Sequence, residues 1–104
     1  MNASPETETW WLYLLLCSDN SIYVGIAKDA DARFEMHRHG RGARYTRIHP
    51  PVRLLARQPF PDYRSAAQAE RATKRLTPVQ KRELARSLGA TERSLFVCQL
   101  ESTG

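Results

Sequence analysis

Five side chains in this sequence carry groups suited to proton transfer, charge neutralisation and metal binding. Tyr13 and Tyr23 lie in two successive runs of aliphatic, β-branched and aromatic residues, which predict strands. Arg33 and His37 stand four positions apart, so they are neighbours on one face of a helix. Glu70 lies among alanines, whose small side chains would let another element or a ligand approach its carboxylate. Their joint use depends on a fold that brings them together.

Each of these features also has an interpretation without function. Arg33 and His37 alone fit a solvated basic helix face. Glu70 is spaced to form an i,i+4 ion pair with Lys74, a surface arrangement that contributes little to stability. Spacing alone favours these simpler interpretations.

The turn between the two apolar runs decides whether the tyrosines share a face of the sheet. Ser18-Asp19-Asn20 is a strong turn signal, and as a three-residue loop it pairs Tyr13 with Gly25. Such a loop places its last residue in the left-handed region, which Asn tolerates. Tyr13 and Tyr23 are then diagonal neighbours about 7–8 Å apart. A two-residue loop would put them on opposite faces, so we predict the three-residue loop.

The rest of the chain alternates helix and strand signals. They predict a helix over 30–39, which is capped by Asp29 and ended by Gly40-Arg41-Gly42, and then a basic loop. An edge strand is predicted over 52–60, stopped by Pro59 and Pro61. Two helices then begin with capping boxes at Ser65 and Thr77, and the second runs to 88, where Gly89 closes it. The order β-β-α-β-α-α predicts an α/β (α+β) domain, with a small three-stranded mixed or antiparallel sheet flanked by helices.

At 104 residues the chain has the size of one domain. We expect a flexible polar tail over 1–9, the folded domain over 10–88, and a C-terminal extension over 89–104. Within that extension, 94–100 fits either a short strand or an apolar tail. Cys17 and Cys98 each lie in an apolar run and predict buried, reduced thiols. The longest apolar run is too short to span a bilayer, so we expect a cytoplasmic protein without a membrane partner.

Basic residues outnumber acidic residues by 16 to 11, which gives a net charge of +5 and favours a polyanionic partner. Residues 33–57 hold seven arginines, three histidines and one acid, Glu35. Guanidinium groups, a hydroxyl and flexible glycines suit phosphate contacts, and Tyr45 could stack on a base. The candidate nucleic-acid-binding residues are Lys28, Arg41, Arg44, Tyr45, Arg47 and Lys74.

In order and at these spacings, several short motifs resemble the GIY-YIG nuclease superfamily, especially its bacterial branch of small stand-alone proteins. The resemblance extends over about residues 10–84. Trp11 stands where the family name has glycine, and the only asparagines, Asn2 and Asn20, leave none for the late asparagine of several superfamily nucleases. The motifs are Trp11-Leu12-Tyr13, Tyr23-Val24-Gly25, Arg33, His37, Glu70, the loop Gly42-Ala43-Arg44-Tyr45-Thr46-Arg47 and Phe60-Pro61-Asp62.

The resemblance implies metal-dependent hydrolysis of nucleic-acid phosphodiester bonds, with DNA favoured over RNA and low sequence specificity. Tyr13 and Tyr23 would be the motif tyrosines, and Arg33 the catalytic arginine that neutralises non-bridging oxygens. His37 would be its frequent companion one helical turn later. Glu70 would hold the divalent metal, Mg²⁺ or alternatively Mn²⁺.

The identity of the general base stays open at this stage. A tyrosine ordinarily titrates at about pH 10 and needs nearby cations to act as a base at neutral pH, whereas a histidine titrates at about pH 6.5. The resemblance favours Tyr23, with His37 relaying or orienting the proton.

Two other classes of function fit the same sequence. One is a nucleic-acid-binding module that keeps the fold without turnover, which chelation of metal would leave unaffected. The other is an adaptor whose basic surface docks an acidic protein. The sequence predicts no particular protein partner.

Overall fold

Three antiparallel strands form the centre of the computed structural model, which describes residues 8–97. Along the chain the elements are β1 (Trp10–Cys17), β2 (Ile22–Ala27), α1 (Ala30–Arg38), α2 (Arg44–Ile48), β3 (Pro51–Phe60), α3 (Tyr63–Lys74), α4 (Pro78–Ser87) and the 3-10 helix η2 (Glu92–Leu95). The predicted fold class is confirmed, and the sheet is antiparallel throughout, in the order β2-β1-β3.

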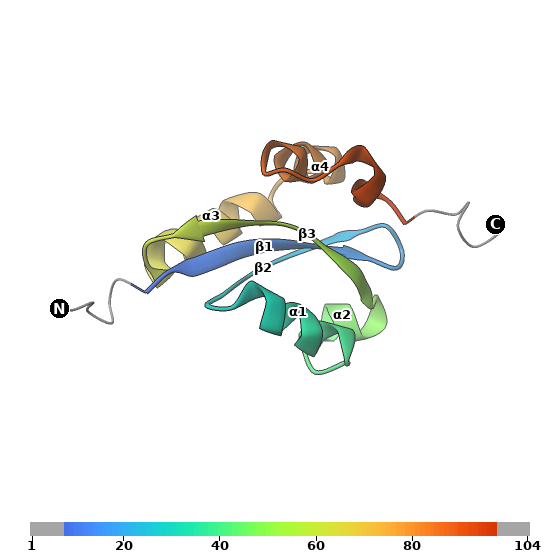
Figure 1. The fold of residues 1–104 in the computed structure, drawn as a ribbon, viewed down its shortest axis with the longest axis horizontal. Helices are drawn as coiled ribbons and strands as arrows, with labels where there is room; N and C mark the ends of the chain where they lie inside the picture. Colours follow the sequence, from blue (N-terminus) through green and yellow to red (C-terminus); the bar gives the residue numbers. More distant parts are fainter. Residues whose placement is uncertain (1–7, 98–104) are drawn as a thin grey trace.

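Helices cover both faces of the sheet, and β1 is therefore apolar on both of its faces. Figure 1 shows α1 and α2 on one side of the strands and α3 and α4 on the other. Leu12, Leu14 and Leu16 point into the core beneath α4, whereas Tyr13 and Leu15 pack on the opposite face toward α1. This alternation is the two-residue period of a strand, so Tyr13 faces the α1 side of the sheet.

The hairpin between β1 and β2 has the predicted register. Tyr13 pairs with Gly25 and Leu15 pairs with Tyr23. Asn20 closes the loop with a φ of 70°, in the left-handed region expected for the last loop residue. The ring centroids of Tyr13 and Tyr23 lie 6.5 Å apart, on one face of the sheet.

The helix caps agree with the sequence at α1 and α4. The Asp29 carboxylate accepts from the Ala32 amide at 3.0 Å, and Thr77 and Gln80 form a reciprocal capping box. The predicted Ser65 capping box is wrong, because α3 begins at Tyr63 with Asp62 as its N-cap. Asp62 follows the end of β3 directly and is as good a cap as serine, so the helix starts there.

The basic segment after α1, predicted as a loop, contains the short helix α2. In this helix the Thr46 hydroxyl donates to the Ala43 carbonyl at 2.9 Å, and Thr46 also contacts His37 of α1. The edge strand β3 begins at Pro51 and continues through Pro59, which did not stop it. An edge strand tolerates proline because one side of its backbone needs no partner.

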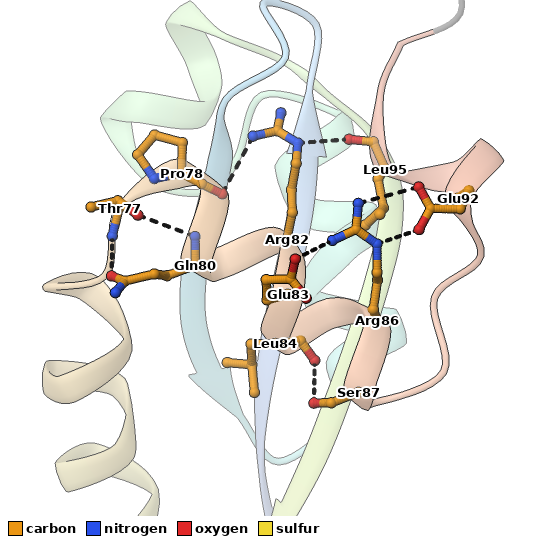
Figure 2. A network of polar contacts seen from close by, with 10 residues as sticks. All are labelled: Thr77, Pro78, Gln80, Arg82, Glu83, Leu84, Arg86, Ser87, Glu92 and Leu95. Atoms are coloured by element: carbon orange, nitrogen blue, oxygen red, sulfur yellow. Dashed lines mark hydrogen bonds and ion pairs between the residues drawn. The ribbon is translucent and has the colours of Figure 1, made fainter.

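The C-terminal part of the described chain packs onto the core through α4 and η2. Leu95 is fully buried, and Glu92–Leu95 forms a 3-10 turn rather than a strand. Arg82 donates to the carbonyls of Pro78, Leu95 and Asn20, which joins α4 to η2 and to the tip of the β1–β2 hairpin. Figure 2 shows its contacts with Pro78 and Leu95.

Cys17 is a buried free thiol, as predicted, and burial raises its pKa to about 11. Cys98 and the predicted apolar residues up to Leu100 lie outside the described residues, as does the tail over 1–7. Within residues 8–97 no helix has the length and apolar character that crossing a membrane requires.

Candidate active site

The sheet face that carries Tyr13 opens into a cleft of about 350 Å³. All five side chains singled out for chemistry line it, although they come from four different elements. The hairpin supplies both tyrosines, α1 supplies the basic pair, and α3 reaches the cleft with its glutamate. Its lining is Tyr13, Tyr23, Gly25, Ile26, Arg33, His37, Arg41, Gly42, Ala43 and Glu70.

A buried chain of hydrogen bonds runs from Tyr13 through His37 to α2. The Tyr13 hydroxyl lies 3.0 Å from His37 Nε2, and His37 Nδ1 lies 2.7 Å from Thr46 Oγ1. The exposed fractions of these three residues are 2%, 3% and 1%. Because the groups are shielded from water, each of them depends on the next for its hydrogen bond.

The direction of these bonds fixes the tautomer of His37. The Thr46 hydroxyl donates its one hydrogen to the Ala43 carbonyl at 2.9 Å, so its oxygen accepts from His37 Nδ1. We therefore assign the proton of the neutral imidazole to Nδ1. Nε2 then accepts from the Tyr13 hydroxyl. His37 is thus held by both ring nitrogens.

Burial and charge keep this chain in its neutral form. Burial lowers the pKa of His37, and the Arg33 guanidinium lowers it further. Burial also raises the pKa of Tyr13 far above its ordinary value, with Tyr23 adding to the shift and Arg33 opposing it. Tyr13 is therefore a hydroxyl donor at neutral pH. The second tyrosine, Tyr23, lines the cleft half-buried, and its ring lies 5.2 Å from that of His37.

Two glycines allow the walls of the cleft to approach each other. A Cβ at Gly25 would collide with the Tyr13 hydroxyl, which explains why the residue opposite Tyr13 is glycine. A Cβ at Gly42 would collide with the imidazole of His37. The sequence predicts Gly42 as part of a helix breaker and of a flexible basic loop, but not this contact, which is made with a residue of α1.

Among the described residues that line the cleft, Glu70 is the only carboxylate, and its side chain is 23% exposed. It also forms the i,i+4 ion pair expected from spacing, with Lys74 Nζ 3.3 Å away. Residues 8–97 hold no group of three His, Cys, Asp or Glu side chains arranged for a metal. The donor set fits a hard cation that keeps most of its water and takes one protein carboxylate, such as Mg²⁺.

The predicted nucleic-acid-binding residues divide into four groups in the structure. Arg41 lines the cleft, whereas Arg44 and Arg47 are exposed on α2 outside it. Lys28 is turned toward the N-terminal end, where it pairs with Glu8 at 2.8 Å. Lys74 and Tyr45 line a separate groove.

Tyr45 is less free to stack on a base than its sequence context predicts. Its ring stacks on Tyr23 at 5.9 Å and lies 4.8 Å from the ring of His49. Its hydroxyl donates to Ser21. Thr46 also faces inward rather than toward a phosphate. Both changes follow from the helical turn of α2, which brings the consecutive side chains of Tyr45 and Thr46 against Tyr23 and His37.

Comparison with known proteins places this geometry in a family. Residues 9–83 match the GIY-YIG catalytic domain. The UPF0213 protein of Xanthomonas axonopodis pv. citri is 54% identical over 72 residues, which cover 69% of this chain and 71% of the relative. The UPF0213 protein of Bacillus velezensis is 37% identical over 92 residues, covering 88% and 93% of the two chains.

A solved structure shares the fold. The solution NMR structure of the UPF0213 protein of Bacillus halodurans superimposes with a TM-score of 0.52 at 36% identity, covering 84% of this chain and 92% of the other. The names of these relatives state no activity. The domain match, in contrast, implies a nuclease family and hence interaction with nucleic acid. The chain therefore belongs to the GIY-YIG catalytic domain family and to the UPF0213 proteins.

Proposed function

We propose that this protein is a metal-dependent endonuclease that hydrolyses phosphodiester bonds, with DNA favoured as substrate and low sequence specificity. The observation that carries the proposal is the cleft itself, which gathers two tyrosines, an arginine, a histidine and a glutamate from four elements. The simpler interpretations of these residues do not explain why side chains 57 positions apart along the chain, Tyr13 and Glu70, line one cleft. Low specificity follows because binding would depend on backbone contacts of the basic surface.

Arg33 and Tyr23 have the roles closest to the reacting phosphate in this proposal. The Arg33 guanidinium would neutralise charge that develops on the non-bridging oxygens. In its deprotonated, phenolate form Tyr23 would take the proton of the attacking water as the new phosphorus–oxygen bond forms and the bond to the leaving oxygen breaks. His37 is the weaker candidate for this base, because both of its ring nitrogens are already engaged, with Tyr13 and Thr46.

Tyr13 and His37 would act together as a positioning pair. The Tyr13 hydroxyl donates its hydrogen to His37, so its oxygen keeps a lone pair that can accept a hydrogen bond from a water in the cleft. Glu70 would hold the divalent cation, and a bound cation of this kind supplies Lewis-acid stabilisation of the phosphate and the leaving oxygen. The ion pair with Lys74 orients the Glu70 carboxylate at the edge of the cleft.

The test is a cleavage assay on labelled single-stranded, duplex and branched DNA and on RNA, with Mg²⁺ or Mn²⁺. Cleavage that is lost on chelation, in Glu70→Ala and in Tyr23→Phe would support the proposal. The matched control is Tyr63→Phe, which removes an exposed phenol hydroxyl outside the cleft and should cut like the parent. A Tyr23→Phe variant that cuts as fast as the parent would remove Tyr23 as the base.

One observation favours the non-catalytic binding module as a second candidate. Glu70 is already paired with Lys74, which is the arrangement that a purely structural glutamate would adopt. Binding to DNA or RNA that persists under chelation, with no cleavage on any substrate, would select this alternative.

A further inference from the structure

A second hollow adjoins the cleft at Tyr23, which lines both. It is a groove of about 250 Å³ between β2, α2, α3 and α4. Tyr23 lines both hollows, so the groove lies directly next to the cleft. The groove is lined by Ile22, Tyr23, Val24, Tyr45, Lys74 and Lys81.

The walls of the groove combine positive charge with an apolar and aromatic surface. Ile22 and Val24 are buried and belong to the core, and Tyr45 stacks on Tyr23. The two ammonium groups come from α3 and α4. No carboxylate lines this groove within the described chain. This combination suits an anion linked to less polar groups, as in the sugar–phosphate backbone of a nucleic acid.

Lys81 is the unusual member of this lining. Lys74 is balanced by Glu70, but among residues 8–97 no carboxylate oxygen lies within 4 Å of Lys81. Its side chain is only partly exposed, and burial lowers its pKa, with Lys74 lowering it further. A partly buried cation without a counter-charge costs folding free energy, so an anion that binds there gains an interaction that the protein alone does not satisfy.

We propose that Lys81 and Lys74 bind a backbone phosphate of the nucleic-acid strand in this groove, next to the phosphate held in the cleft. The proposal rests on the proposed function, because the cleft defines where the strand lies. An ammonium is a point charge that contacts phosphate without reading the base, so this subsite would add affinity independent of sequence. It would also fix the path of the strand across Tyr23.

The test measures binding without cleavage. Fluorescence anisotropy of a labelled DNA duplex, titrated at several salt concentrations in a chelator, gives the dependence of affinity on salt for the parent, Lys81→Gln and Arg93→Gln. Arg93 is exposed and lines neither hollow, so its replacement removes the same charge elsewhere. Loss of one phosphate contact should lower the slope of log affinity against log salt by about 0.9 for Lys81→Gln only. Equal slopes in the two variants would overturn the subsite.

A stability measurement excludes a merely structural role. Removing an unbalanced cation should leave the urea midpoint of Lys81→Gln equal to or above that of the parent. A clearly lower midpoint would assign the binding defect to the fold and overturn the proposal.

Cleavage of the same duplex with Mg²⁺ separates this inference from the proposed function. If the parent binds through Lys81 but does not cleave, the subsite is supported and the proposed hydrolysis is rejected. A parent that cleaves while both variants bind alike keeps hydrolysis and rejects the subsite. A parent that binds neither DNA nor RNA rejects the subsite.

Discussion

At the scale of single residues, the centre of the site is a neutral imidazole held between two hydroxyls. Although His37 belongs to a basic helix, it is buried, with an exposed fraction of 3%. The spacing predicted correctly that His37 lies next to Arg33 on one helix face, and both line the cleft. It could not indicate Thr46 or Gly42 as partners, because a threonine and a glycine within an arginine-rich segment have many uses and only the packing of α2 on α1 selects one.

The pH dependence of stability should report the state of His37. Its pKa is lowered in the folded state by burial and by Arg33, so the unfolded chain binds the proton more readily. This contribution to stability is therefore fully present above about pH 6.5, the unfolded value, and is lost as the pH falls from there through the lower folded pKa. Urea midpoints measured from pH 8 to pH 5 should fall more steeply in the parent than in His37→Gln.

His39→Gln is the matched control for that comparison, since His39 has a side chain that is 64% exposed. It should follow the parent curve. If His37→Gln followed it as well, the imidazole would not be the buried neutral group assigned above.

Thr46 is a positioning residue whose effect passes through His37. Thr46→Val leaves the buried Nδ1 hydrogen of His37 without an acceptor, which should cost about 1–3 kcal/mol of stability. Because Thr46 would no longer hold the His37 proton on Nδ1, kcat should also fall with KM nearly unchanged. The acidic limb of the pH profile of cleavage should shift as well. Thr46→Ser keeps the hydroxyl and should restore both properties. A Thr46→Val enzyme with the kcat and pH profile of the parent would limit Thr46 to a packing role.

At the scale of elements, local signals were decisive where one residue type dominates a position. Asn20 at the end of the hairpin loop and the Thr77 capping box were both predicted and both confirmed. The start of α3 was wrong because Asp62 and Ser65 are competing caps and only the end of β3 decides between them. The helical turn of α2 could not be predicted, since five residues form a helix only when tertiary contacts support them.

Arg82 joins three elements and gives the hairpin tip a fixed position relative to α4. Its guanidinium donates to carbonyls of Pro78, Leu95 and Asn20 and lies 4.2 Å from the ring of Phe96. Arg82→Met should lower the free energy of unfolding by about 2–3 kcal/mol, because buried carbonyls lose their donors. Chemical denaturation followed by circular dichroism measures this change.

The control for Arg82 lies one turn further along the same helix. Arg86 pairs with Glu83 and Glu92 at the surface, as Figure 2 shows, and such pairs contribute little. Arg86→Met should therefore destabilise the protein much less than Arg82→Met. Equal losses would mean that helix propensity or net charge, rather than the buried donor network, explains the effect.

At the scale of the whole molecule, the acidic residues balance only some of the basic ones. Arg38 pairs with Glu35 at 3.1 Å and Arg57 pairs with Asp31 at 2.7 Å. On α2, Arg44 and Arg47 have no carboxylate within 4 Å in the described part of the chain. The net charge of +5 is thus unevenly distributed, and the unbalanced positive charge of α2 lies beside the cleft that Arg41 lines.

Two double variants with the same loss of charge can test whether this uneven distribution guides nucleic-acid binding. Arg44→Gln with Arg47→Gln removes two unbalanced cations, whereas Arg38→Gln with Arg57→Gln removes two that already have carboxylate partners. The first pair should lower the slope of log affinity against log salt by up to about 1.8 on duplex DNA, at 0.9 per phosphate contact. The second should change it far less, because each removal also frees an anion that repels the backbone. If both double variants shifted the slope equally, only the net charge would matter, and α2 would have no particular part in holding the strand.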